Sequence, residues 1–227
     1  MNIFPFTLLA FGFLSGMKHA FEADHIAAVS SITSNQNSIR KSSLLGLFWG
    51  FGHAIALSIV GLIILLLKIE IPEKIALLLE LIVGIMLVIL GFNVLTTINK
   101  NKMHIHKHKH GNEEHIHFHL HKLTKAHLHM HIPFKQSLLI GLIHGLAGSA
   151  AITLLVLTAI NSVLLGLFYI LIFGIGSTLG MVLISGIISL PLILIPYKFD
   201  KMQKILHIST GAISTLIGFN IMLNILK

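Results

Sequence analysis

The chain contains no cysteine in its 227 residues, and only 11% of its side chains are charged. Without cysteine there are no disulfides, iron–sulfur clusters or thiolate-bound zinc, so a metal ion must be bound by imidazole, carboxylate, thioether or backbone oxygen. The scarcity of charge excludes an ordinary soluble domain, in which about a quarter of the residues are charged. Hydrophobic residues instead make up 55% of the chain. This composition indicates a membrane protein.

Six apolar stretches are long enough to cross about 30 Å of hydrocarbon as helices that rise about 1.5 Å per residue. They are residues 3–32, 43–67, 75–98, 136–160, 163–190 and 203–226. None of them alternates apolar and polar residues as the strands of a membrane β-barrel do. Several boundaries are marked by prolines, at Pro72, Pro133, Pro191 and Pro196. We therefore predict an all-α polytopic membrane protein with six transmembrane helices.

The lysines and arginines between these stretches are unequally divided between the two sides of the membrane. One side would carry Arg40, Lys41, the seven lysines from Lys100 to Lys135, Lys198, Lys201 and Lys204, and the other side Lys68, Lys74 and Lys227. Positive residues accumulate in the cytoplasmic loops of membrane proteins, so we predict that the first side faces the cytoplasm. The protein would then lie in the cell membrane with both termini outside. Orientation thus explains the net charge of +8, and no nucleic-acid partner is expected.

Spans in the two halves of the chain share short sequences. The matches are residues 44–48 with 164–168 at an offset of 120, Gly16 and His19 with Gly141 and His144 at 125, and Gly84, Gly91, Phe92 and Asn93 with Gly211, Gly218, Phe219 and Asn220 at 127. We interpret them as two three-helix units, residues 1–98 and 134–227, on either side of a loop at 99–133. Three crossings per unit would invert the second unit, as in many secondary transporters whose substrate site lies between the repeats. The alternative is chance similarity between leucine- and glycine-rich spans.

The first span carries an unusual number of polar side chains, namely Lys18, His19, Glu22, Asp24 and His25. A charge at the centre of a membrane costs about 2.5–3.5 kcal/mol, so such groups face a cavity or one another. On a regular helix His19 and Asp24 would lie about 140° apart, at about 100° per residue. We therefore expect either a break in the helix, for which Gly16 is the candidate, or partners from other spans. A purely structural alternative pairs Lys18 with Glu22 and leaves the histidines bonded to neighbouring carbonyls.

Two further histidines in other spans are the candidate partners. His53 follows a Gly-Phe-Gly sequence in the second span, and His144 lies between glycines in the fourth. The predicted metal ligands are therefore His19, Glu22, Asp24, His25, His53 and His144. Imidazole and carboxylate together suit Ni²⁺, Co²⁺ or Zn²⁺, whereas Mg²⁺ and Ca²⁺ prefer oxygen alone. Glu80 and His207, near the starts of the third and sixth spans, are expected to be interfacial. Asn93 and Asn220 are expected to cap or cross-link helices, with contact to the substrate as the alternative.

The loop between the two units holds 11 of the 16 histidines. They are His104, His106, His108, His110, His115, His117, His119, His121, His127, His129 and His131. Their period-two spacing places the imidazoles on one side of an extended chain, where they can chelate transition-metal ions weakly. We expect a mobile cytoplasmic segment that buffers metal or hands it over. The alternative is a dispensable low-complexity insertion.

The His-x4-Asp-His sequence of the first span resembles the signature of the nickel/cobalt transporter superfamily. Residues 16–29 look like the short, six-span members of this superfamily, the urease-accessory type of nickel permease, and residues 47–53 and 141–149 are similar to that group's second- and fourth-span motifs. The resemblance implies that the two histidines and the aspartate of the signature bind the ion, with His53 contributing. The His-rich loop is more like that of related efflux permeases, which tend to lack the aspartate present here as Asp24.

From residues and resemblance together we predict a secondary transporter, a permease for Ni²⁺ or Co²⁺ that favours uptake, and no enzymatic activity. The chain has no Gly-x4-Gly-Lys-Ser/Thr loop for nucleotide, so the energy must come from an ion gradient, the membrane potential or a partner. The alternatives are a nickel/cobalt efflux permease, a membrane-embedded metalloenzyme with histidine ligands, and a metal sensor. No prosthetic group is expected, because the ion is the substrate. A second copy of the chain and a cytoplasmic metallochaperone are the protein partners left open.

Overall fold

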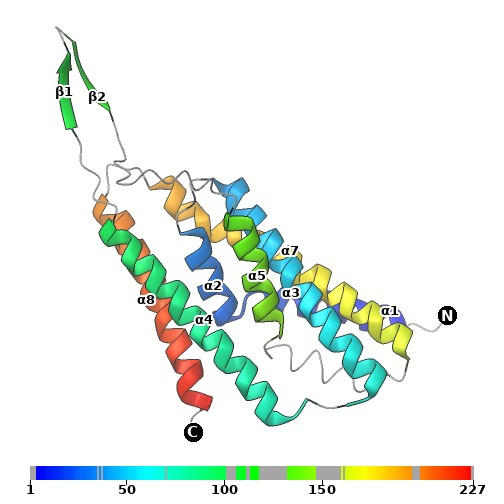
Figure 1. Cartoon of the computed structure of the whole chain (residues 1–227). Helices are drawn as coiled ribbons and strands as arrows, with labels where there is room; N and C mark the ends of the chain where they lie inside the picture. Colours follow the sequence, from blue (N-terminus) through cyan, green and yellow to red (C-terminus); the bar gives the residue numbers. More distant parts are fainter. Residues whose placement is uncertain are drawn as a thin grey trace.

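The computed structural model describes residues 4–34, 36, 38–69, 71–100, 106–110, 113–117, 132–146, 160, 162–195 and 200–225. These residues form seven α-helices and one two-stranded hairpin (Figure 1). The helices make up a bundle, and the hairpin extends from one end of it.

Four helices in the described part of the chain are long and apolar enough to cross a membrane. They are α3 (Ile39–Leu67), α4 (Glu73–Lys100), α7 (Val163–Leu194) and α8 (Asp200–Ile225). Large apolar side chains on their outer faces, such as Leu66, Phe92, Leu164 and Leu216, are more than half exposed. Apolar surface of this extent is stable in hydrocarbon and unfavourable in water. The protein is therefore a membrane protein, as the composition predicts.

The first predicted span is two helices rather than one. Helix α1 (Phe4–His19) ends in a tight turn, and α2 (Ala23–Thr33) follows it. The turn is closed by the N–H groups of Phe21 and Glu22, which donate to the carbonyls of Lys18 and His19 at 2.9 and 3.0 Å. The prediction that Gly16 marks the break is wrong, because Gly16 lies inside α1 and lets that helix approach the backbone of α7.

Two other boundaries differ from expectation. Helix α5 (Ile132–Leu146) covers the start of the predicted fourth span, and residues 147–159 of that span lie outside the described residues. Helix α7 continues through Pro191 and ends at Leu194, between the two prolines Pro191 and Pro196 and beyond the predicted end of the span at residue 190. Pro191 lies in the last turn, where its missing N–H removes a single helical hydrogen bond.

The hairpin is formed by β1 (His106–His110) and β2 (Glu113–His117), which pair antiparallel with His108 opposite His115. Within the described residues, this hairpin is the part that differs from the predicted all-α fold. Its extended backbone agrees with the period-two interpretation of the loop for the five histidines that it contains. The other six loop histidines lie outside the described residues, namely His104, His119, His121, His127, His129 and His131.

Helix α2 lies in the middle of the bundle, in contact with α3, α4, α7 and α8 (Figure 1). Around it, α3 packs against α5 and α7, α1 packs against α7, and α4 packs against α8. The main buried cluster includes Ala27, Ala28 and Val29 of α2 together with Trp49, Leu87 and Met181. This packing holds the first turn of α2, which contains Asp24 and His25, inside the bundle.

Candidate metal centre

Five of the predicted ligands meet at the break between α1 and α2. His19 is the last residue of α1, and Asp24 and His25 are in the first turn of α2. His53 projects from α3, and His144 is near the end of the described part of α5. The turn between α1 and α2 brings both sides of the broken span to one point, which a straight helix could not do.

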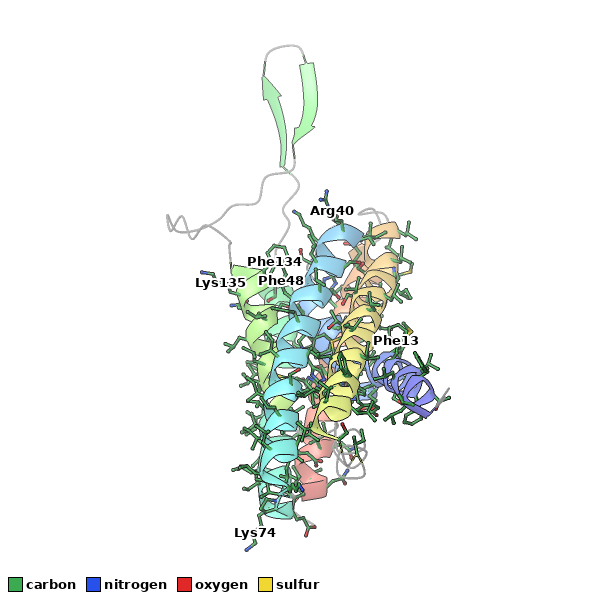
Figure 2. All side chains as sticks on the ribbon, turned by 90° about the vertical axis from the view of Figure 1, so that its right-hand side faces the viewer. Phe13, Arg40, Phe48, Lys74, Phe134 and Lys135 are labelled. Atoms are coloured by element: carbon green, nitrogen blue, oxygen red, sulfur yellow. The ribbon has the colours of Figure 1, made fainter. Side chains whose placement is uncertain are left out.

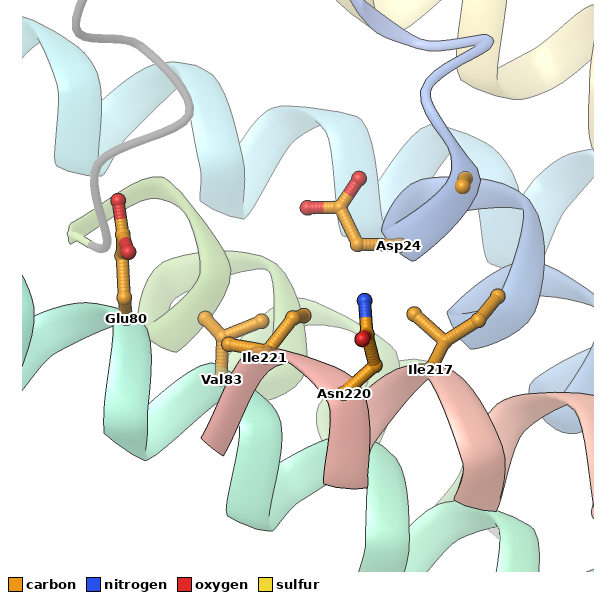
Figure 3. A pocket seen from close by; sticks show the side chains of 7 residues that line it. Asp24, Glu80, Val83, Ile217, Asn220 and Ile221 are labelled. Carbon is orange, nitrogen blue, oxygen red and sulfur yellow. The ribbon is translucent and has the colours of Figure 1, made fainter. Parts of the chain in front are cut away.

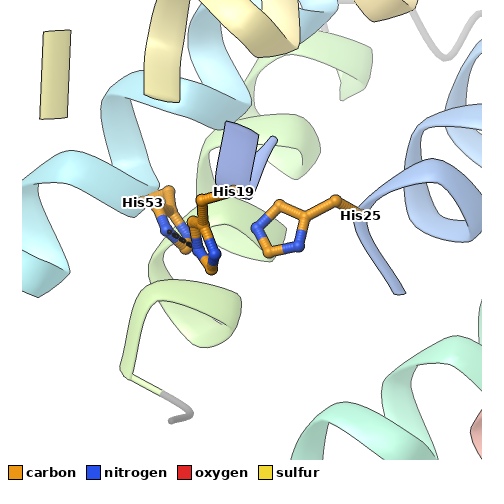
Figure 4. A group of neighbouring side chains, drawn as sticks. All are labelled: His19, His25 and His53. Carbon is orange, nitrogen blue, oxygen red and sulfur yellow. Dashed lines mark hydrogen bonds between the residues drawn. The ribbon is translucent and has the colours of Figure 1, made fainter. Parts of the chain in front are cut away.

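The four imidazole rings form a compact, buried cluster. The ring centres of His19 and His25 are 4.4 Å apart, and those of His25 and His144 are 4.2 Å apart. Figure 4 shows the His25 ring facing His19 and His53. No ring of the four is more than 4% exposed. Two groups, His19–His25–His53 and Asp24–His25–His144, each have ligand atoms within 4.8 Å of one another, as a bound metal ion requires.

Asp24 determines which nitrogen atoms of two rings are free. Its Oδ1 lies 3.1 Å from Nδ1 of His25, and its Oδ2 lies 2.9 Å from Nε2 of His144. An ionised carboxylate only accepts hydrogen bonds, so both of these nitrogens must donate. Nε2 of His25 and Nδ1 of His144 are then lone-pair nitrogens, and both are buried without a hydrogen-bond partner among the described residues.

A second chain of contacts has the same effect on His53. Oε1 of Glu22 lies 3.1 Å from Nδ1 of His19, which therefore donates to it. Nε2 of His19 then accepts from Nε2 of His53 at 3.2 Å (Figure 4). Nδ1 of His53 is left as a buried lone-pair nitrogen with no partner in the described structure. Each unpaired buried polar atom costs about 1–3 kcal/mol, and a cation bound there would remove that cost.

Glycines allow the helices that carry His53 and His144 to approach closely. A Cβ at Gly52 of α3 would fall against the backbone of Leu138 in α5. In the other direction, a Cβ at Gly145 of α5 would lie 2.9 Å from the Cα of His53. Only glycine fits at such helix contacts, and small residues of this kind are the usual packing surface in membranes. The Gly-x-Gly-His sequence of α3 therefore marks a close helix contact beside the candidate ligand His53.

Aromatic side chains enclose the cluster. The Trp49 ring centre is 5.3 Å from that of His25 and 5.6 Å from that of His144, and the Phe173 ring is 5.6 Å from His19. These rings exclude water on their sides, and a hydrophobic shell strengthens the interaction between a cation and its ligands.

A cavity of about 340 Å³ adjoins the cluster at Asp24 (Figure 3). It lies between α2, α4 and α8, and its lining is Ala23, Asp24, Glu80, Val83, Ile217, Asn220 and Ile221. The sequence predicted Glu80 to be interfacial and Asn220 to cap or cross-link helices, with substrate contact as the alternative for Asn220, and it did not predict this cavity. The available signal was the presence of a carboxylate at Glu80, within an otherwise apolar span.

The family model NicO, described as high-affinity nickel-transport protein, matches residues 5–226. The chain belongs to the NicO family. Urease accessory protein UreH of Bacillus sp. (strain TB-90) is 39% identical over 219 residues, which cover 96% of this chain and 92% of the relative. No solved structure matches the chain. The predicted resemblance is confirmed, and the NicO family places the chain among nickel transporters rather than enzymes.

The structural alternative, in which Lys18 pairs with Glu22 and the histidines bond to neighbouring carbonyls, does not fit the contacts of this NicO protein. Glu22 contacts His19 and not Lys18, and Lys18 is exposed and forms no ion pair within the described residues. The imidazoles of His19, His53 and His144 contact one another or Asp24 instead of neighbouring carbonyls. Of the six predicted ligands, Glu22 alone is well exposed, at 43%, and lies at the edge of the cluster.

Proposed function

We propose that the chain is a secondary transporter that carries Ni²⁺ and Co²⁺ inward across the cytoplasmic membrane. The observation that supports this most strongly is the convergence of four histidines and Asp24 from four helices at one buried point. Imidazole nitrogens without partners are costly inside a membrane bundle unless a cation passes between them. Nickel transport by the family supports the same conclusion.

In this proposal the imidazoles hold the ion and Asp24 orients them. Nε2 of His25, Nδ1 of His53 and Nδ1 of His144 are the lone-pair nitrogens that the hydrogen bonds leave free. Asp24 also supplies a negative charge beside the cation. Ligands of this kind suit Co²⁺ as well as Ni²⁺, because both are borderline divalent ions that prefer imidazole to all-oxygen sites.

We also propose that the two three-helix units are inverted repeats, residues 1–98 and 134–227. Reciprocal contacts between matched glycines support this. A Cβ at Gly84 would lie 3.0 Å from the carbonyl of Gly218, and one at Gly211 would lie 2.9 Å from the carbonyl of Gly91. Gly84 matches Gly211 and Gly91 matches Gly218 at the offset of 127, so each contact is the image of the other, as a two-fold axis requires.

The first and fourth spans also make equivalent contacts in the two units, but their residues match at a different offset. Gly12 packs against Tyr169 of α7, and Gly141 packs against Trp49 of α3. Trp49 and Tyr169 are 120 residues apart, which is the offset that the sequence predicts between the second span (α3) and the fifth span (α7). The equivalence of Gly12 and Gly141 corresponds to an offset of 129 instead of 125. The histidine of α5 is then no longer the counterpart of the histidine of α1.

The proposed inward direction of transport rests on the charge of the ion and the membrane potential. With the inside negative by about 100 mV, a divalent cation gains about 4.6 kcal/mol on moving inward, so uptake needs no second ion. Rocking of one repeat against the other would expose the cluster to each side in turn. The loop at 99–133 would lie in the cytoplasm, where its histidines buffer the imported metal or pass it to a metallochaperone.

The test is nickel accumulation by the purified protein in sealed vesicles, with a potential imposed in either direction. An inside-negative potential should drive Ni²⁺ and Co²⁺ inward through the wild type, and His25→Ala should reduce the initial rate at least about tenfold. His207→Ala is the matched control, because His207 bonds only to the carbonyl of Gln203 within its own helix in the described structure.

Accumulation by the His25→Ala protein at the wild-type rate would rule out the cluster as the transport site. Transport that requires a proton gradient and moves nickel outward would instead identify an efflux permease. A preference for Zn²⁺ over both other ions would overturn the substrate assignment while leaving the site in place.

A further inference from the structure

We propose that the cavity between α2, α4 and α8 is an outer binding site, where a hydrated divalent cation is captured on Glu80 before it reaches the histidines. This inference rests on the proposed transport function and adds a second position for the same ion. It assigns a role to Glu80 and Asn220, which are not part of the histidine cluster.

The cavity and the cluster share a residue. Asp24 lines the cavity and is also bonded to His25 and His144, so an ion in the cavity is adjacent to the ligands that would receive it. Figure 3 shows that the side chain of Asn220 points toward Asp24. Glu80 lies at the other end of the cavity. An ion that moves through the cavity toward the imidazoles therefore meets the carboxylate of Glu80 first and that of Asp24 last.

The size of the cavity suits an ion that still carries its water. About six waters at about 30 Å³ each occupy about 180 Å³. The cavity of about 340 Å³ holds such an ion with room to move. The histidine cluster has ligand atoms within 4.8 Å of one another and leaves no such space. Water would therefore be removed between the two positions.

The chemistry of the lining fits capture rather than tight binding. Glu80 is half-buried and forms no hydrogen bond or ion pair with any described residue. Carboxylate and amide oxygens interact well with the water shell of a hard or borderline cation, whereas imidazole replaces that shell. The apolar walls at Val83, Ile217 and Ile221 lower the local dielectric constant and strengthen the attraction to both carboxylates.

The position of Glu80 agrees with capture from outside. Glu80 lies in the second turn of α4, on the half of the helix that begins near Lys74. Lys74 is at the end of the bundle away from the hairpin, Arg40 and Lys135 (Figure 2). With the orientation proposed above, the ion arrives at Glu80 from the external side.

The experiment is the dependence of initial uptake on nickel concentration in sealed vesicles, for the wild type and Glu80→Gln. Loss of the capturing charge should raise the half-saturating concentration about five- to tenfold and leave the maximal rate within about twofold. Glu73→Gln is the matched control, because Glu73 is an exposed carboxylate in the first turn of the same helix and does not line the cavity.

A second pair of variants guards against misfolding of Glu80→Gln. Asn220→Ala should also raise the half-saturating concentration, whereas Asn93→Ala, at the matching position of the other repeat and outside the cavity lining, should not. An unchanged half-saturating concentration for both Glu80→Gln and Asn220→Ala would overturn the capture site. Normal transport by His25→Ala would count against the histidine cluster alone, so the two proposals fail separately.

Discussion

At the scale of single residues, Asp24 is the group on which the cluster depends. One carboxylate accepts from two imidazoles that belong to different helices, at 3.1 and 2.9 Å. Both rings are thereby held in one tautomer and one orientation, with the opposite nitrogen turned away from the carboxylate. Carboxylates that orient metal-binding histidines in this way typically change metal affinity or activity by about 10- to 100-fold when they are removed.

Replacement of Asp24 by asparagine tests this role. The amide keeps one accepting oxygen but presents an N–H₂ group where the second oxygen was, so one of the two imidazoles must turn or change tautomer. We expect the initial rate of nickel uptake to fall about 10- to 100-fold while the protein remains folded in detergent. Rates should be measured against the amount of protein in the vesicles. A rate within twofold of wild type would show that Asp24 does not orient the rings.

At the scale of helices, close contacts place the histidines. The α3–α5 contact has glycine on both helices, and a Cβ at Gly145 would lie 2.9 Å from the Cα of His53 and from the Cβ of Ala56. Neither neighbour is the flexible end of a side chain, so an added methyl group must separate the helices. Separation of α3 from α5 moves His53 and His144 apart.

We therefore expect Gly145→Ala to abolish most nickel uptake through displacement of the ligands, at a stability cost of about 1–3 kcal/mol. Gly186→Ala is the control, since the nearest atom to a Cβ there is the hydroxyl oxygen of Ser43, which can rotate away. Uptake rates and thermal unfolding in detergent should be compared for both variants. Equal rates for Gly145→Ala and Gly186→Ala would show that the α3–α5 contact does not position the site.

The sequence predicted which polar residues lie close together more reliably than it predicted the shape of the helices that carry them. A carboxylate and imidazoles inside an apolar span are conspicuous on energetic grounds, and the helical angle between His19 and Asp24 already requires a break or outside partners. The position of the break was not predictable, because residues 20–22 contain neither glycine nor proline. Gly180 of α7, which lies against Ala20, contributes to that turn through a tertiary contact. Glu80 was missed because its role depends on the cavity beside α2.

At the scale of the whole molecule, the two ends of the bundle differ in what they carry. Arg40 and Lys135 lie at the end that bears the hairpin, and Lys74 lies at the other end (Figure 2). The positive-inside rule then predicts a cytoplasmic hairpin. The lack of cysteine makes this easy to test, because a single introduced thiol is the only reactive one in the chain.

Single-cysteine variants Lys74→Cys and Lys135→Cys should differ in their reaction with a membrane-impermeant maleimide. Both positions are exposed, so neither needs unfolding to react. In intact cells we expect labelling of Lys74→Cys alone, and labelling of both after permeabilisation. Labelling of Lys135→Cys alone in intact cells would reverse the orientation, and would place the capture cavity on the cytoplasmic side.

The bond between Asp24 and His144 joins residues that are 120 positions apart. At a synthesis rate of about 5–20 residues per second, a ribosome needs about 6–24 seconds to make the chain between them. During that interval the nascent first helices hold a carboxylate whose second imidazole does not yet exist. Insertion machinery or local water must accommodate this group until α5 arrives, so the order of synthesis makes early membrane insertion the vulnerable stage in the biogenesis of this protein.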